Sequence, residues 1–194
     1  MRRIQLTALI IACSVAVAGP VWSVDLVEPT NWTGFKAGVL LDGDVELGDA
    51  TVDQETSFLL QAFYDFPFGD NVFYGLGADI LGMKWRGETD EQRVDETELL
   101  LDVGLHFKAL LRPFGNRFAV RPGGGIGYGV MRRLENLNGS NFLTLKAYVE
   151  FVYQFDTERV ILIDVGVWDA PTGGDAETDI TIGPLAFVRA GIAF

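Results

Sequence analysis

The chain's single histidine, His106, could take part in acid–base chemistry with Asp102, four residues earlier. If the segment is a strand, the two side chains lie on one face, because side chains alternate between the faces of a sheet. A catalytic imidazole also needs a nucleophile within reach. No His-x-Ser arrangement accompanies His106. We therefore interpret His106 as a structural, hydrogen-bonded histidine, and the sequence predicts no catalytic residue and no cofactor.

Acidic residues concentrate in two segments, 42–55 and 169–182. Their carboxylates are Asp42, Asp44, Glu46, Asp49, Asp53 and Glu55 in the first, and Asp169, Asp175, Glu177 and Asp179 in the second. Asp42-Gly43-Asp44 could coordinate Ca²⁺ or Mg²⁺ through carboxylate oxygens. The spacing differs from that of an EF-hand loop. Solvated, mutually repelling surface carboxylates are the interpretation we favour, so no metal site is predicted.

A third group of charges recurs on one side of strand-like segments. It contains five basic residues, Lys36, Lys108, Arg121, Lys146 and Arg189, and five acidic ones, Asp65, Asp79, Asp102, Glu150 and Asp164. Unpaired charges in a poorly hydrated interior are very costly. The equal numbers therefore predict an internal salt-bridge network that plugs a narrow barrel. A proton or small-ion path along the same residues is the alternative.

Eight segments of alternating polarity would position these charges. They run approximately over 32–42, 56–66, 72–83, 97–111, 118–130, 141–155, 160–168 and 183–194. In the fourth, the bulky apolar row from Leu99 to Phe107 lies opposite a row that carries Asp102, His106 and Lys108. A lysine or arginine facing lipid at mid-bilayer costs about 2–4 kcal/mol. The segregation predicts an all-β fold: a closed antiparallel eight-stranded transmembrane β-barrel with its apolar face outward.

The connections alternate in length. Turns near 67–71, 112–117 and 156–159 are short, whereas connections near 43–55, 84–96, 131–140 and 169–182 are longer. Short periplasmic turns and long extracellular loops are typical of outer-membrane barrels, and an even strand number places both termini in the periplasm. Aromatic residues gather at the short-turn end and predict an interfacial girdle: Tyr64, Phe66, Tyr74, Phe107, Phe118, Tyr153, Phe155 and Phe194. Pro122, followed by three glycines, predicts a bulge or bend in the fifth segment.

The N-terminal segment predicts export. Arg2 and Arg3 precede an apolar run over residues 4–17, followed by small residues. This is the layout of a signal peptide over residues 1–23, with cleavage after Ala18 or Ser23, which leaves one barrel domain over residues 24–194. A retained anchor, or a lipidated Cys13, is the alternative. Without residues 1–23 the net charge is 13 − 27 = −14, which argues against nucleic acid as a partner.

The leader, the eight alternating strands, the glycine-rich stretch over residues 121–129 and the terminal Phe194 resemble the small outer-membrane barrels of the OmpA/OmpX type. The resemblance implies a location in the outer membrane of a Gram-negative cell, in contact with membrane lipid and lipopolysaccharide. It also implies that the strand ending at Phe194 is read by the outer-membrane assembly machinery. No peptidoglycan-binding domain is expected after the barrel. The exposed loops, Arg132 and Arg133 among them, could contact lipid A phosphates or an unknown extracellular ligand.

Two other functions are compatible with parts of the pattern. Some small barrels are enzymes that modify lipid A, but the sequence lacks their catalytic constellation. A soluble periplasmic lipocalin-like binding protein would turn the apolar face inward. The proposed inner face is instead rich in glycine, at positions 38, 75, 77, 104, 123, 125, 127, 166 and 191, which suits the crowded interior of a narrow barrel. We therefore expect a non-enzymatic membrane barrel with a structural or surface-interaction role.

Overall fold

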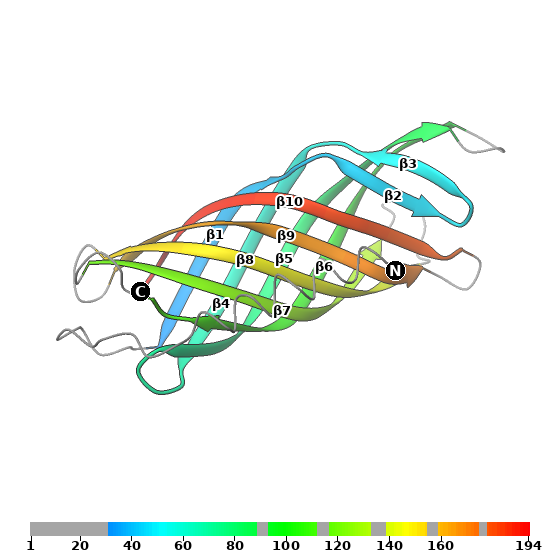
Figure 1. The fold of residues 1–194 in the computed structure, drawn as a ribbon. Helices are drawn as coiled ribbons and strands as arrows, with labels where there is room; N and C mark the ends of the chain where they lie inside the picture. Colours follow the sequence, from blue (N-terminus) through cyan, green and yellow to red (C-terminus); the bar gives the residue numbers. More distant parts are fainter. Residues whose placement is uncertain (1–30, 89–92, 112–116, 133–138, 155–158, 175–177) are drawn as a thin grey trace.

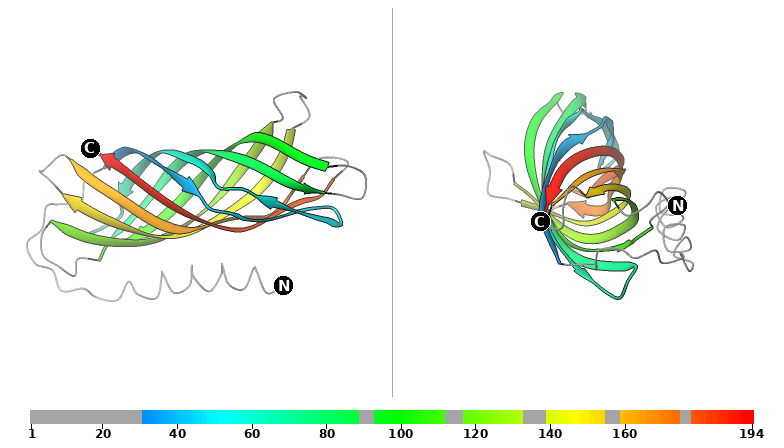
Figure 2. Two further views of the ribbon diagram at one scale, coloured as in Figure 1. Left: turned by 90° about the horizontal axis from the view of Figure 1, so that it is seen from above. Right: turned by 90° about the vertical axis from the view of Figure 1, so that its left-hand side faces the viewer.

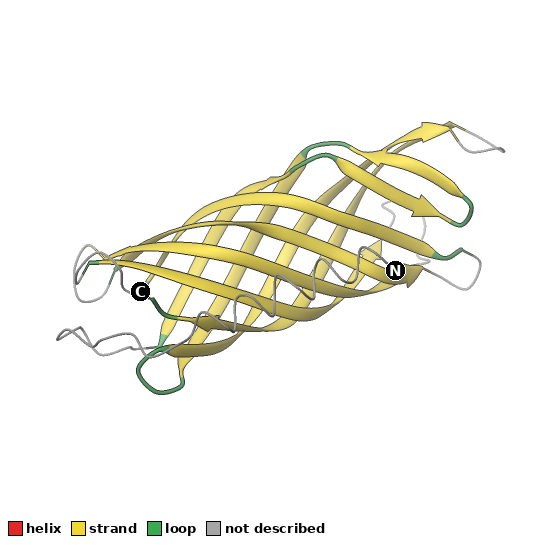
Figure 3. Cartoon of the chain, viewed as in Figure 1, coloured by secondary structure: helices red, strands yellow, loops and turns green. Residues whose placement is uncertain are grey.

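The structure is a computed structural model that describes residues 31–88, 93–111, 117–132, 139–154, 159–174 and 178–194. The predicted leader over residues 1–23 lies outside the described residues. The described part consists of strands and short connections (Figure 3). The strands are β1 (Trp32–Leu40), β2 (Gly43–Leu47), β3 (Ala50–Gln54), β4 (Ser57–Pro67), β5 (Val72–Glu88), β6 (Arg93–Ala109), β7 (Phe118–Arg132), β8 (Gly139–Gln154), β9 (Val160–Gly174) and β10 (Ile180–Ala193). Within these ranges, no helix has the length and apolar character needed to cross a membrane.

Eight of the strands form a closed antiparallel ring in the order β1, β4, β5, β6, β7, β8, β9, β10 and back to β1 (Figures 1 and 2). Pairing between the first and last strands closes the ring. At this seam the Thr33 amide donates to the Phe194 carbonyl at 2.9 Å, and the Phe194 amide donates to the Thr33 carbonyl at 3.0 Å. The predicted all-β, eight-stranded antiparallel barrel is confirmed.

Strands β2 and β3 form a hairpin within the segment predicted as the first long loop. The hairpin continues the wall between β10 and β5, pairing with both. It also keeps the register of β1 and β4, since Leu40 pairs with Ser57 and Gly43 with Gln54. The acidic residues of this segment alternate with inward-facing Val45 and Val52, which are buried. The acidic residues of this segment therefore did not indicate a loop, because solvated carboxylates also occur on the outer face of a strand.

The other long connections are also partly strand. β5 continues to Glu88, β6 begins at Arg93, and β9 continues to Gly174. Asp169, expected in a solvated loop, is a buried strand residue. We call this end of the barrel the hairpin end, and the opposite end, where β4–β5, β6–β7 and β8–β9 connect, the short-turn end.

The predicted bulge at Pro122 is not observed. β7 keeps one register with β8 throughout, and Pro122 pairs with Val149. Toward β6 the ladder is interrupted between the Lys108–Gly123 pair and the Leu111–Val120 bridge. A proline in a strand lacks the amide hydrogen that the ladder requires, which explains why the pairs with β6 are missing next to Pro122. Register shifts occur instead near Pro171 and Pro184, in the pairings of β8 with β9 and of β9 with β10.

The outer face carries a continuous set of exposed apolar side chains. On β6 alone these are Leu99, Leu101, Val103, Leu105 and Phe107. At the short-turn end, Phe66 stacks on Tyr74 with ring centroids 5.2 Å apart. Of the predicted girdle, Phe155 lies outside the described residues. The bulky apolar rows thus face outward, opposite to a lipocalin-like arrangement.

Candidate functional site

The interior of the barrel brings together the ten charged residues that the alternation pattern predicted. Each of the eight ring strands contributes at least one of them, and all ten are buried: Lys36, Asp65, Asp79, Asp102, Lys108, Arg121, Lys146, Glu150, Asp164 and Arg189. We call this set, with His106, the internal ion chain. The alternation of side chains along each strand is what directs these residues inward.

The chain begins near the short-turn end at Asp65. One oxygen of this carboxylate lies 2.5 Å from His106 Nε2. The other oxygen accepts a hydrogen bond from Lys108 Nζ at 2.8 Å and lies 3.0 Å from Arg121 Nη1. One acid from β4 therefore joins groups from β6 and β7.

Glu150 is the centre of the chain. It accepts a hydrogen bond from Arg121 Nε at 2.5 Å, forms an ion pair with Lys36 and lies 3.5 Å from Lys108 Nζ. Lys36 continues to Asp164, with 2.9 Å between Nζ and Oδ2. Three basic residues thus share this one buried carboxylate.

Arg189 carries the chain toward the hairpin end. Its guanidinium donates to both oxygens of Asp164, at 3.0 and 2.6 Å, and to Asp79 Oδ1 at 2.9 Å. Lys146 pairs with Asp79 and lies 2.8 Å from Asp102 Oδ2. Acids and bases therefore alternate from Asp65 to Asp102.

Two neutral side chains donate hydrogen bonds to Asp102, the last carboxylate of the ion chain. Asp102 accepts hydrogen bonds from Thr144 Oγ1 at 2.8 Å and from Trp168 Nε1 at 3.2 Å. The alternation pattern identified Asp102 as inward-facing but gave no signal for Trp168, which was expected at the very end of a strand. A buried indole usually finds a partner for its N–H, and here the partner is a carboxylate.

Apolar side chains lie on both sides of the ion chain. At the short-turn end a cluster of buried residues contains Phe63, Phe73, Leu110, Ala119, Val152, Val160, Leu162 and Ala193. At the hairpin end a larger cluster includes Met83, Trp85, Leu100, Met131, Phe142, Trp168, Ile182 and Phe187. Arg121 Cζ lies 4.3 Å from the ring centroid of Trp32 and 5.0 Å from that of Phe73, and the two rings also pack against each other with centroids 5.5 Å apart. These clusters exclude solvent around the charges and strengthen their mutual attraction.

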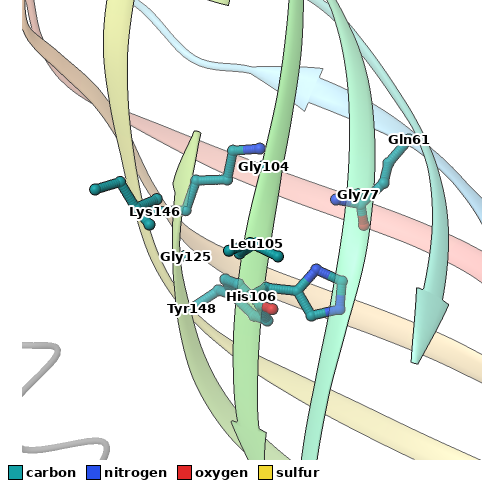
Figure 4. Close-up of a pocket in the computed structure, with 9 residues that line it drawn as sticks. Gln61, Gly77, Gly104, Leu105, His106, Gly125, Lys146 and Tyr148 are labelled. Carbon is teal, nitrogen blue, oxygen red and sulfur yellow. The ribbon is translucent and has the colours of Figure 1, made fainter. Parts of the chain in front are cut away.

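Glycines make room for the ion chain, as the sequence predicted. A Cβ at Gly127 would overlap the Asp102 carboxylate, and one at Gly75 would overlap His106 and a backbone carbonyl. Opposite His106, Gly77 leaves a cavity of about 10 Å³, which Lys146 and Tyr148 also line (Figure 4). This is about the minimum volume that a single water molecule needs.

His106 is buried and hydrogen-bonded, but its partner is Asp65 and not Asp102. His106 and Asp102 share the inward face, as predicted. The Asp102 carboxylate, however, contacts Lys146, Thr144 and Trp168.

We expect His106→Ala to lower the free energy of unfolding by about 1–2 kcal/mol, because one buried hydrogen bond is lost while Asp65 keeps Lys108 and Arg121. Urea unfolding in lipid vesicles, followed by tryptophan fluorescence, measures the change. If His106→Ala prevents the barrel from folding, His106 does more than form one structural hydrogen bond, and this interpretation is wrong.

The Asp42-Gly43-Asp44 segment shows an ordinary hydrogen-bonding role, since Asp42 accepts a hydrogen bond from the Thr56 hydroxyl. Over the described ranges, histidine, cysteine and carboxylate side chains form no group of three or more suited to a metal ion. Asp175, Glu177 and Arg133 lie outside the described residues.

Comparisons with known proteins agree with the ring geometry. No family model matches the sequence, and no curated protein is detectably similar. Among solved structures, the chain is similar to the outer membrane protein OprG from Pseudomonas aeruginosa, with a TM-score of 0.59 and 14% sequence identity over 87% of this chain and 98% of that chain. Ail, the attachment invasion locus protein of Yersinia pestis, aligns over 86% of this chain and all of that chain with a TM-score of 0.44 and 10% identity. The likeness to OprG shows a shared fold, that of a small outer-membrane barrel.

Proposed function

We propose that this chain is an integral outer-membrane protein whose closed barrel serves a structural or surface-interaction role. The outward face supports this proposal. Large apolar side chains that a soluble protein would bury are exposed on all eight ring strands, including Phe35, Leu60, Leu76, Leu105 and Ile163. Soluble monomers rarely expose apolar patches larger than a few hundred Å², whereas a membrane barrel requires an outward apolar band.

The internal ion chain is the observation that supports a closed lumen. Its five acids and five bases alternate through direct contacts across the interior, and apolar clusters cover both of its ends. Eight strands leave an interior that side chains can fill. Ions would have to displace these pairs to pass, so the barrel is proposed to be plugged and not to act as a pore.

The proposed orientation follows from the connections. The short-turn end, with the β1–β10 seam that includes Phe194, would face the periplasm, and the hairpin end would face outward. Residues 1–23 would act as a cleaved signal peptide, and the β10 strand would be read by the assembly machinery. No cofactor and no enzymatic activity are part of the proposal.

Planar-bilayer recordings test the closed lumen. We expect the purified barrel to show no large, steady conductance, because the ion chain occupies the lumen. A general diffusion porin recorded in the same membrane serves as the positive control. Large, steady conductance steps from the folded barrel would overturn the plugged interpretation.

Membrane fractionation followed by a heat-modifiability gel tests the membrane location. Folded barrels resist detergent and migrate differently before and after boiling. We expect the protein in the outer-membrane fraction, with such a shift. A monomer that is folded in plain buffer without detergent would contradict the proposal and favour a soluble binding protein.

A further inference from the structure

Gly77 faces the interior, but close packing does not require a glycine there. Three neighbouring inward glycines, at positions 75, 104 and 125, would each place a Cβ within 2.7 Å of a backbone carbonyl oxygen, so a side chain is excluded at those positions. A Cβ at Gly77 would lie 3.4 Å from Gln61 Nε2 and 3.4 Å from His106 Nδ1, which are ordinary van der Waals distances. Alanine would therefore fit at position 77, and the glycine keeps open a space that a methyl group would fill.

The cavity beside Gly77 is small and polar. Its volume is about 10 Å³, which admits one water molecule and no larger ligand. Four of its lining residues carry polar side chains and are at least nine-tenths buried: Gln61, His106, Lys146 and Tyr148. An internal water makes two to four hydrogen bonds to groups of this kind, whereas cavities that stay dry are apolar. The size and the lining of the cavity therefore both select water.

His106 presents a hydrogen-bond acceptor to this cavity. Its Nε2 lies 2.5 Å from Asp65 Oδ1, and because an ionised carboxylate only accepts hydrogen bonds, Nε2 carries the proton. Lys108 and Arg121 already pair with Asp65, so a second proton on the imidazole would add an unbalanced charge to a buried site, which is costly. The ring is therefore expected to be neutral, with a lone pair on Nδ1 that faces the space beside Gly77 (Figure 4).

Gln61 and Lys146 supply hydrogen-bond donors to the same cavity. The Gln61 amide donates one N–H to Asp79 Oδ2 at 3.3 Å and carries a second N–H. Lys146 Nζ forms ion pairs with Asp79 and Asp102, and its ammonium carries a third N–H. A water molecule in the cavity can therefore donate to His106 Nδ1 and accept from these two side chains.

We propose that this cavity binds one internal water molecule, which bridges His106 Nδ1 to the Gln61 amide and the Lys146 ammonium and thereby closes the internal ion chain into a ring. His106 contacts Asp65 at the start of the chain, and both donors contact Asp79 close to its other end. The water also holds the imidazole in one tautomer and one orientation, because each ring nitrogen then has a partner. The site lies inside the barrel, so it does not depend on the proposed membrane location.

NMR spectroscopy tests the water site directly, because the chain has a single histidine. In protein that carries isotope-labelled histidine and no histidine tag, every imidazole signal comes from His106. We expect the pattern of one neutral tautomer protonated at Nε2, together with a cross-peak between the ring protons and water. The variant Gly77→Ala should lose this cross-peak, because the methyl group takes the place of the water, and should keep the Nε2 proton.

Gly129→Ala is the matched control. It adds the same methyl group to the inward face of β7, outside the cavity, where the nearest atoms of Leu100 and Thr144 would be 3.2 Å away. This variant should keep the water cross-peak. Absence of the cross-peak from the unaltered protein overturns the proposal. Retention in Gly77→Ala also overturns it, because the signal then comes from an exchanging side-chain proton such as that of Tyr148.

A heat-modifiability gel reports whether each variant has folded. If Gly77→Ala does not fold, a crystal structure of the unaltered barrel takes its place in the test. An ordered water within hydrogen-bonding distance of His106 Nδ1 supports the site, and a cavity without one overturns it.

Discussion

Replacing Glu150 with glutamine should lower the free energy of unfolding by about 3–5 kcal/mol, the usual effect of removing one partner from a buried ion pair. Glu150 is fully buried and contacts Lys36, Lys108 and Arg121. Glutamine preserves the shape of the side chain and removes its charge. The internal ion chain then holds five basic residues against four acids in a buried setting. Urea unfolding in lipid vesicles, followed by tryptophan fluorescence, measures the loss.

A surface carboxylate provides the matched control. Glu55 also bridges two basic residues, but its side chain is 30% exposed. Exposed ion pairs contribute about 0–1 kcal/mol, so Glu55→Gln should change the free energy of unfolding by less than 1 kcal/mol. Adding Lys36→Met to Glu150→Gln leaves four acids and four bases in the ion chain. The double variant should therefore recover part of the lost free energy of unfolding. Equal effects of Glu150→Gln and Glu55→Gln would show that the interior is hydrated and that the ion chain is not dry.

An arginine at Val103 should destabilise the membrane-inserted barrel by about 2–4 kcal/mol, the cost of a cation on the lipid face at the bilayer midplane. Val103 is 51% exposed and lies at the middle of the outward row of β6, between Leu99 and Phe107. Unfolding in vesicles measures this change. In a soluble protein the same exposed position would tolerate arginine within about 0.5 kcal/mol.

Depth provides the control for this substitution. Thr97 is exposed on the same strand and the same face, nearer to the hairpin end. The cost of arginine near the interface falls to about 0–1 kcal/mol, so Thr97→Arg should be tolerated. Val103→Ala separates the effect of lost side-chain volume from that of charge. If the two arginine variants are equally stable, this face does not contact hydrocarbon.

The period-two pattern was sufficient to predict the ring and the direction of its charges. Residues such as Asp102 and Lys146 could be placed inward from alternation alone, because a membrane barrel admits only one face for ionised groups. Which charges pair could not be predicted, since the partners come from different strands. His106 illustrates this point, because its partner Asp65 is 41 residues away in sequence and depends on the register of three strands.

The hairpin end was the least predictable region. There the strands extend beyond the apolar band. Polar residues are therefore tolerated at outward positions, and the alternation of apolar and polar residues that predicts a strand becomes weak. The segment that contains Val45 and Val52 was therefore predicted as a loop. The inward cluster around Trp85 and Trp168 was missed for the same reason.

The distribution of the ion chain over all eight ring strands has a consequence for biogenesis. A sheet that lacks even one strand loses at least one contact of the ion chain, for example those of Arg189 with Asp164 and Asp79 before β10 has docked. A strand that slips by two residues breaks the same contacts while leaving its apolar row outward. Incomplete or misregistered sheets therefore gain little stability from these ion pairs. We expect barrel closure to be all-or-none, because the full set of ion pairs forms only when β10 pairs with β1.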